Sequence, residues 1–175
     1  MDKPKVIGLD LSLTSTGIAF ANGSTTVIKG AAHHGDWRLC RIRDAVAYAI
    51  ETERPDLVVI EDLPTHAKSA GLTGMVHGAV RSLLVAREVP YALISPATLK
   101  AYATGKGNAD KAGMLWAAYR WGSAEFADDK GGDQRDAWWL RIAGLQWLGS
   151  PEFELPAAQV ARLDKAKWPE MEVAR

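Results

Sequence analysis

The sequence predicts a single α/β domain in which a mixed β-sheet of about five strands, the first three antiparallel, is flanked by helices. Three observations predict this class. Short β-branched runs open the chain, an Asn-Gly pair marks a hairpin between two of them, and later apolar runs alternate with segments of helical periodicity. Strands separated by helices favour crossover connections within one sheet.

The opening segment predicts a three-stranded meander. Residues 5–10 (KVIGLD) form a short apolar run that ends in an acid, and the SLTSTG that follows predicts a tight turn. Residues 17–21 and 25–32 then predict two further strands, joined at Asn22-Gly23.

Two helices and two buried strands are expected next. Residues 36–53 carry apolar side chains at helical spacing, with Asp36 as the expected N-cap. Residues 57–62 (LVVIED) predict a central strand. Residues 72–88 predict a helix with one broad apolar face, and residues 91–95 (YALIS) predict another buried strand.

The rest of the chain is predicted to be helical. A helix begins at Pro96, a second covers residues 109–120 after a Gly-rich break, and residues 133–148 form an amphipathic helix rich in tryptophan. The pattern then weakens, so residues 151–175 are expected to be a C-terminal extension with one short helix near 156–164. No internal repeat or linker divides the chain.

Composition restricts the functional classes. The chain has 175 residues, of which 47% are hydrophobic and 24% charged, as in a soluble globular protein. Its apolar stretches are shorter than the ~18 residues of a membrane span, and its charged N-terminus does not resemble a secretory signal. The single cysteine, Cys40, excludes an internal disulfide and fits a reducing compartment. We therefore expect a cytoplasmic protein with no membrane partner.

The charge is balanced overall and uneven locally. The 21 basic and 21 acidic residues cancel, whereas a nucleic-acid-binding protein usually has an excess of basic residues. Lys100, Lys106, Lys111 and Arg120, however, lie in a stretch whose only acid is Asp110. This strip is the expected contact with a polyanion, although solvated lysines in a Gly-rich loop are an equally ordinary interpretation.

Carboxylates at the ends of the predicted elements are the candidate site. Asp10 and Glu61 end two apolar runs, where an ionised carboxylate is costly unless it is paired, hydrogen-bonded or bound to a metal. Asp133 and Asp136 open a helix at a spacing that puts both on one face, at the end where negative charge is favoured. Four such acids can bind two hard divalent cations. The alternative is that Asp133 is only the N-cap of its helix.

The residues that carry these acids resemble a known family. GLDLSLTSTGIA (8–19), VVIEDL (58–63), GMVHGAVRSLL (74–84), the block from Pro96 to Lys111 and DQRDAWW (133–139) are similar, in the same order, to RuvC-type Holliday junction resolvases. That family belongs to the RNase H-like nuclease superfamily. The resemblance covers most of residues 5–148 and implies an RNase H-like nuclease domain over residues 1–150.

The resemblance also implies a reaction and a site. Asp10, Glu61, Asp133 and Asp136 match the family's metal-binding acids, which hold two Mg²⁺ ions (or Mn²⁺) that activate water for phosphodiester hydrolysis. Lys111, counted with the catalytic set, and Lys100 match its DNA-handling lysines, and we add Lys106 from its charge and loop position. The implied protein is a homodimeric crossover junction endodeoxyribonuclease of recombination and repair that cuts branched DNA, above all four-way junctions.

Two features leave the substrate and the dimer open. Pro64 and His66 follow Glu61 where the family often has an aromatic residue that probes the junction, so the preferred branch and sequence are in doubt. This departure and the compact length would suit a phage-encoded member acting in the host cytoplasm. Gly74 and Gly78 permit close helix approach, either at the dimer contact or against the sheet.

Two other functions compete with the nuclease. One is a branched-DNA-binding protein of the same fold that does not cut. The other is a sugar-kinase or actin-like ATPase, because GLDLSLTSTG also resembles the first phosphate loop of that superfamily. Those ATPases need two such domains around the nucleotide, for which this chain is too short.

Overall fold

A five-stranded mixed sheet forms the centre of the molecule. The structure is a computed structural model that describes residues 3–63 and 70–170. The strand order is β3-β2-β1-β4-β5, in which β1 to β3 are antiparallel neighbours and β4 and β5 run parallel to β1. The strands are β1 (Val6–Asp10), β2 (Ser15–Ala19), β3 (Thr25–Lys29), β4 (Leu57–Glu61) and β5 (Tyr91–Ile94). The predicted mixed sheet with an antiparallel opening is confirmed.

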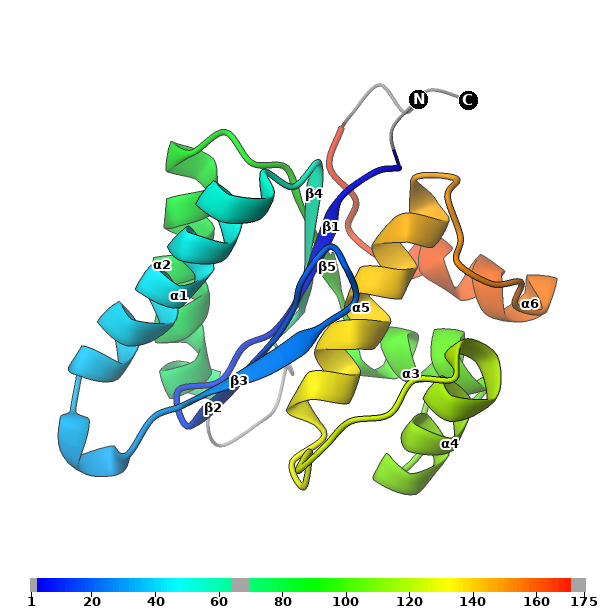
Figure 1. The fold of residues 1–175 in the computed structure, drawn as a ribbon, viewed down its shortest axis with the longest axis horizontal. Coiled ribbons are helices and arrows are strands. Elements are labelled where there is room, and N and C mark those ends of the chain that lie inside the picture. The colour runs from blue at the N-terminus through cyan, green and yellow to red at the C-terminus, as the bar shows by residue number, and fades with distance from the viewer. Residues whose placement is uncertain (1–2, 64–69, 171–175) are drawn as a thin grey trace.

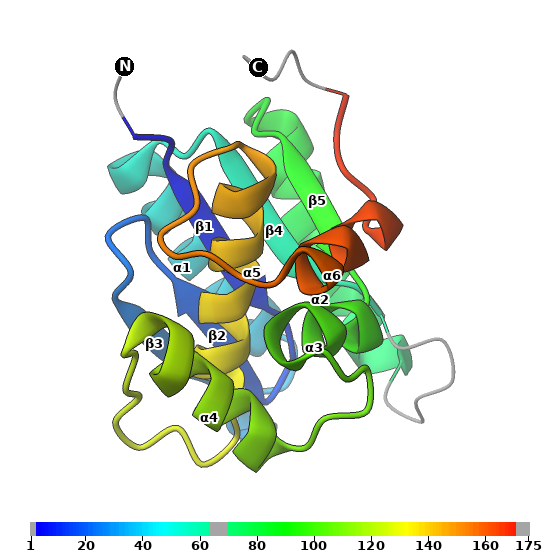
Figure 2. The same ribbon diagram turned by 90° about the vertical axis from the view of Figure 1, so that its right-hand side faces the viewer.

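Helices cover both faces of the sheet (Figure 1). The first two lie on one face, α5 lies on the other, and Figure 2 shows α3 and α4 on the α5 side. The helices are α1 (Trp37–Glu53), α2 (Ala70–Ala86), α3 (Pro96–Thr104), α4 (Lys111–Gly122), α5 (Asp133–Trp147) and α6 (Ala157–Val160), with short 3₁₀ turns at Ala32–His34 and Ala161–Lys165.

Alternation along the strands divides the core into two layers. Ile7 and Leu9 of β1 pack with α1 and α2, whereas Val6 packs on the α5 side. In β4, Val58 and Ile60 likewise face α1 and α2 while Val59 faces α5. Asp10 and Glu61 follow Gly8 and Val59 by two residues in this alternation, so both candidate acids face α5.

The turn and cap predictions are partly confirmed. Gly23 has a φ of +89° in the hairpin between β2 and β3, as its sequence predicts. Ser95 caps α3 through its side chain, which accepts from the N–H of Thr98. Asp36 precedes α1, but its side chain does not cap the helix, because its backbone is already helical (φ −74°, ψ −13°). That prediction was wrong.

Two boundaries also differ from expectation. The predicted turn SLTSTG is only partly a turn, since β2 begins at Ser15, two residues before the expected strand. Thr16 stabilises the preceding bend because its hydroxyl donates to the carbonyl of Ser12 and accepts from the N–H of the same residue. The third strand ends at Lys29, and a 3₁₀ turn at Ala32–His34 occupies the end of the segment predicted as strand.

The C-terminal segment packs on the same core. The Gln159 side chain donates to the carbonyl of Tyr102 in α3 at 2.7 Å, and Leu163 is buried. Lys167 pairs with Leu93 of β5 through a short antiparallel bridge, and the Trp168 ring stacks on Trp147 of α5 at 4.7 Å. Residues 151–170 thus cover α3, α5 and the β5 edge.

Among the helices of the described ranges, none combines the length and the apolar character that crossing a bilayer requires.

Candidate active site

Asp10 and Glu61 lie side by side at one edge of the sheet. Leu9 pairs with Ile60 in parallel register, so the next residue of each strand is one of the two acids. Their side chains are partly exposed and face α5. Because β1 and β4 are neighbours in the sheet, the two acids are adjacent.

Helix α5 lies close against the sheet because β1 and β2 present glycines to it. A Cβ on Gly8 would overlap the carbonyl oxygen of Ala137, and a Cβ on Gly17 would overlap that of Asp133. Gly17 is also the β2 partner of Asp10. The close approach therefore brings the first turn of α5, with its carboxylates, beside the strand-end acids.

The four acids influence one another electrostatically. Desolvation and then the charge of Glu61 raise the pKa of Asp10 well above its usual value, with further contributions from Asp136 and Asp133. Desolvation and then the charge of Asp136 raise the pKa of Glu61 to about 8. Desolvation also raises the pKa of Asp136. All four acids that the sequence singled out thus lie close enough to act on one another electrostatically.

Two cations offset part of this charge. Lys100, on α3, opposes the rise in the pKa values of Glu61 and Asp136 that desolvation causes. Arg135 is only 5% exposed, and its Nε donates to Oδ1 of Asp136 at 2.9 Å. Its Nη1 donates to the carbonyl of Lys111 at 3.1 Å, which joins the start of α4 to the start of α5.

Three contributing residues were missed by the sequence reasoning. Arg135 lies inside the DQRD motif, but nothing in its spacing distinguishes it from a surface residue. Ser15 donates its hydroxyl to Oδ2 of Asp133 at 2.6 Å. Asp129 caps α5, since its two carboxylate oxygens accept from the N–H groups of Gln134 and Arg135. An acid a few residues ahead of a helix start was the available signal for Asp129.

The cap at Asp129 decides between the two interpretations of Asp133. Gly132 occupies the N-cap position, with a φ of +88°, and Asp129 satisfies the N–H groups of the first turn. Asp133 is therefore not the N-cap, and its carboxylate accepts a hydrogen bond from the Ser15 hydroxyl. Negative charge at this helix end is still favoured by the helix dipole.

The donor set suits hard divalent cations. It consists of carboxylate oxygens that are desolvated and mutually repulsive, which a bound cation would relieve. In the conformation seen across residues 3–63 and 70–170, no three His, Cys, Asp or Glu side chains are grouped closely enough to ligate one ion. Ser15 holds Oδ2 of Asp133 and Arg135 holds Oδ1 of Asp136, so the second oxygen of each carboxylate takes part in neither bond.

The predicted lysines occupy different places around the acids. Lys100 is half-buried and acts on two of them, whereas the Lys111 side chain is exposed at the first residue of α4. Lys106 is exposed in the loop between α3 and α4, where its backbone bonds locally to the Thr104 hydroxyl. Pro64 and His66, the departures after Glu61, lie outside the described residues.

Curated relatives align with the sequence over most of its length. The crossover junction endodeoxyribonuclease RuvC of Frankia alni is 31% identical, over 90% of this chain and 87% of its own. The protein of the same name from Saccharopolyspora erythraea is 30% identical, over 93% of this chain and 89% of its own. No family model matches the sequence.

Solved structures share the fold. Thermus thermophilus RuvC superimposes with a TM-score of 0.69 at 21% identity, covering 94% of this chain and 99% of its own. The same protein in complex with a Holliday junction substrate gives 0.70 over 95% of this chain and 99% of its own, also at 21% identity. The yeast mitochondrial Holliday junction resolvase Ydc2 gives 0.51 at 16% identity, over 93% of this chain and 81% of its own. Because two relatives of at least 30% identity align over most of both chains, the chain belongs to the RuvC family of crossover junction endodeoxyribonucleases.

Proposed function

We propose that this protein is a metal-dependent endonuclease that cuts Holliday junctions. The observation that carries the proposal is the group of four carboxylates that β1, β4 and α5 bring together in a member of the RuvC family. Two relatives that align over 87% and 89% of their own length are named crossover junction endodeoxyribonucleases. Other branched DNA is part of the same proposal.

The four acids would hold two Mg²⁺ ions, for which Mn²⁺ can substitute. When bound, such ions supply a nucleophilic hydroxide near neutral pH and charge stabilisation at the phosphate. The protein's own part is orientation. Ser15 holds Asp133, Arg135 holds Asp136, and the glycines under α5 set the distance between the helix and β1.

Lysines would hold the DNA strand beside the acids. Lys100 already acts electrostatically on Glu61, so a phosphate bound at the acids would lie within its field. Lys111 is exposed at the start of α4, which Arg135 joins to the start of α5. Lys106 would contact the backbone further from the chemistry. Each lysine would release counterions and make binding salt-dependent.

The protein would act as a homodimer through the outer face of α2. Leu72, Met75 and Val85 on that helix are 54%, 43% and 65% exposed. A Cβ added to Gly74 or Gly78 would meet no atom of residues 3–63 and 70–170 within 4 Å, so these glycines do not serve packing against the sheet. A two-fold dimer would present two sites to opposing strands of a junction. Sedimentation of the purified chain at micromolar concentration tests the dimer.

Cleavage of a synthetic four-way junction in Mg²⁺ tests the function. Asp10→Asn and Glu61→Gln should each lower the rate by roughly a thousandfold, since each removes a ligand from ions that contribute several kcal/mol. Asp62→Asn is the matched control. Asp62 adjoins Glu61 but is bonded to Lys167 at 2.7 Å and interacts with His77 of α2, away from the acid group. Equal loss in all three variants would contradict the assigned site.

A non-cleaving junction-binding protein is the remaining alternative. A panel of four-way junctions, three-way junctions, flaps and duplex in Mg²⁺ and in Mn²⁺ separates the two. Tight junction binding without any cut in either metal would favour the alternative and exclude the nuclease.

A further inference from the structure

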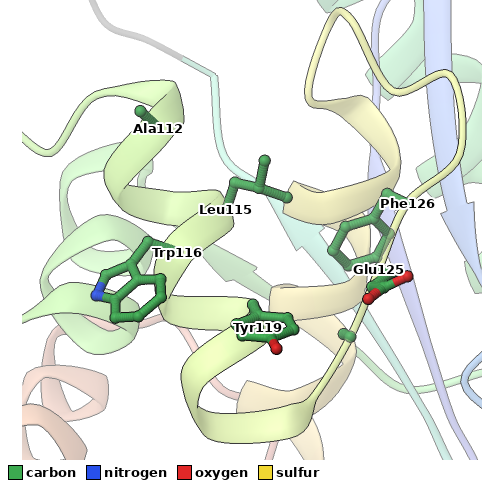
Figure 3. Close-up of a pocket in the computed structure, with 7 residues that line it drawn as sticks. Ala112, Leu115, Trp116, Tyr119, Glu125 and Phe126 are labelled. Carbon is green, nitrogen blue, oxygen red and sulfur yellow. The ribbon is translucent and has the colours of Figure 1, made fainter.

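A groove with exposed aromatic rings runs along the outer side of α4. It has a volume of about 470 Å³. Figure 3 shows Leu115, Trp116 and Tyr119 projecting from α4, with Glu125 and Phe126 on the segment that follows the helix. The three α4 side chains are 47%, 60% and 53% exposed, a contiguous apolar surface of the kind that marks an interaction site.

These rings are not needed for the core of the domain. Helix α4 packs inward through Met114, Ala117 and Ala118, which are buried. Trp116 and Tyr119 are adjacent to one another outside that face, with ring centroids 6.1 Å apart and planes 29° from parallel. Two near-parallel exposed rings form a surface on which flat groups can stack.

The groove lies on the helix that leads away from the carboxylates. Lys111 is the first residue of α4, and its carbonyl accepts from Arg135, which also holds Asp136. Trp116 follows Lys111 by five residues, or ~7.5 Å of helix, and Tyr119 by ~12 Å. At ~3.4 Å per nucleotide of a duplex strand, the rings lie two to four nucleotides from Lys111. A strand at the acids thus has the groove within reach.

The charges around the groove fit a nucleic acid strand. Helix α4 contains Lys111 and Arg120 and no acidic residue, so a positive charge precedes Trp116 and another follows Tyr119 along the helix. Among the described residues that line the groove, Glu125 is the one acid. A carboxylate there repels phosphate but accepts hydrogen bonds from base amino groups. The bases would therefore enter the groove, with the backbone on the lysine and arginine side.

We propose that Trp116 and Tyr119 form a stacking platform for unpaired bases of the DNA strand whose phosphates reach the carboxylate site. The platform takes single-stranded bases, because a base within an intact duplex has no free face to offer a ring. The inference rests on the proposed nuclease function and adds a sequence-tolerant contact outside the acids. Stacking on these rings would stabilise bases that become unpaired near the branch.

Fluorescence of 2-aminopurine tests the stacking. The base analogue is placed at successive positions around the branch of a four-way junction, and binding is followed in EDTA so that no strand is cut. One or two positions should show quenching with the unaltered protein. Trp116→Ala should abolish that quenching and weaken junction affinity about tenfold, whereas Trp116→Phe, which keeps a ring, should retain most of both.

Trp37→Ala is the matched control. Trp37 is 75% exposed at the start of α1, across the sheet from α4, and its loss should leave affinity and quenching unchanged. If Trp116→Ala binds and quenches like the unaltered protein while that protein cuts junctions, the platform is refuted and the nuclease stands. If the unaltered protein neither binds nor cuts any branched DNA, the proposed function fails, and the platform fails with it.

Discussion

The first turn and the C-terminal half of α5 carry buried charge in opposite balance. In the C-terminal half, Arg141 is 2% exposed and donates to both carboxylate oxygens of Glu152, at 2.7 and 3.1 Å. The same guanidinium donates to the carbonyl of Ala21, so each of its three nitrogens has a hydrogen-bond partner. At the N-terminal end, four carboxylates share two cations. The charge of Arg141 is neutralised within the protein, whereas the four acids would be neutralised by the proposed metal ions.

The pKa values express this difference. Hydrogen bonds from Arg141 lower the pKa of Glu152 to about 2, against the opposing effect of desolvation. At the other end desolvation, followed by the charge of Asp136, raises the pKa of Glu61 to about 8. A carboxylate in the first setting favours folding when it is ionised, and one in the second setting opposes it. Stability has been given up at the N-terminal end, where the proposed metal ions would bind.

Breaking the Arg141–Glu152 ion pair should have the largest effect on stability. Arg141→Ala leaves the partly buried Glu152 without its main partner and should lower the free energy of unfolding by about 3 kcal/mol. Lys3→Ala is the control, because Lys3 bonds to the same carboxylate at 2.7 Å but is 57% exposed, and its loss should cost under ~1 kcal/mol. Urea denaturation measures both. Equal losses would show that burial is not what distinguishes the two partners.

Relieving the repulsion among the four acids should increase stability in the absence of metal. The pKa of Glu61 is raised in the folded state, so its stabilising contribution is complete below pH ~4.5 and is lost as the pH rises to about 8. Glu61→Gln removes this loss and should raise the free energy of unfolding at pH 8 by about 2 kcal/mol, and by much less at pH 4.5. Thermal unfolding in EDTA at the two pH values measures it.

Glu152→Gln should show the opposite pH dependence. The pKa of Glu152 is lowered, so its contribution to the free energy of unfolding is present above pH ~4.5 and fades as the pH falls toward 2.

Mg²⁺ should stabilise the unaltered protein more than it stabilises the Glu61→Gln variant. If Glu61→Gln instead lowers stability in EDTA at pH 8, the ionised Glu61 carboxylate does not destabilise the folded protein.

The smallest effect is expected at the cap that joins the loop to α5. Asp129→Asn turns one acceptor into a donor beside the N–H groups of Gln134 and Arg135, and should cost about 1 kcal/mol. Asp128→Asn is the control, because Asp128 is exposed and adjoins Asp129. Asp and Asn both tolerate the φ of +56° at position 128. A cost shared by both variants would place the effect in the loop rather than in the cap.

Sequence reasoning predicted most of the fold because its signals are local. Asn22-Gly23 defines its hairpin, and Ser95-Pro96 defines the start of α3, within a few residues. Alternation in β4 predicted that Glu61 and Asp62 face opposite sides, which the separate partners of the two acids confirm. Asp36 failed as a cap because its backbone is already helical, and no sequence pattern marked the 3₁₀ turn that precedes it.

By itself the sequence determined the order of the elements, the strand ends that carry Asp10 and Glu61, and the shared helix face of Asp133 and Asp136. Only the tertiary structure decided how their charge is balanced. Ser15 and Asp133 are 118 residues apart in the chain and bond because glycines let α5 lie against β2. Periodicity is determined by neighbours along the chain, whereas desolvation and charge pairing depend on what the fold brings from elsewhere. For that reason Arg135 looked like an ordinary surface residue in the sequence and is a buried partner of Asp136 in the structure.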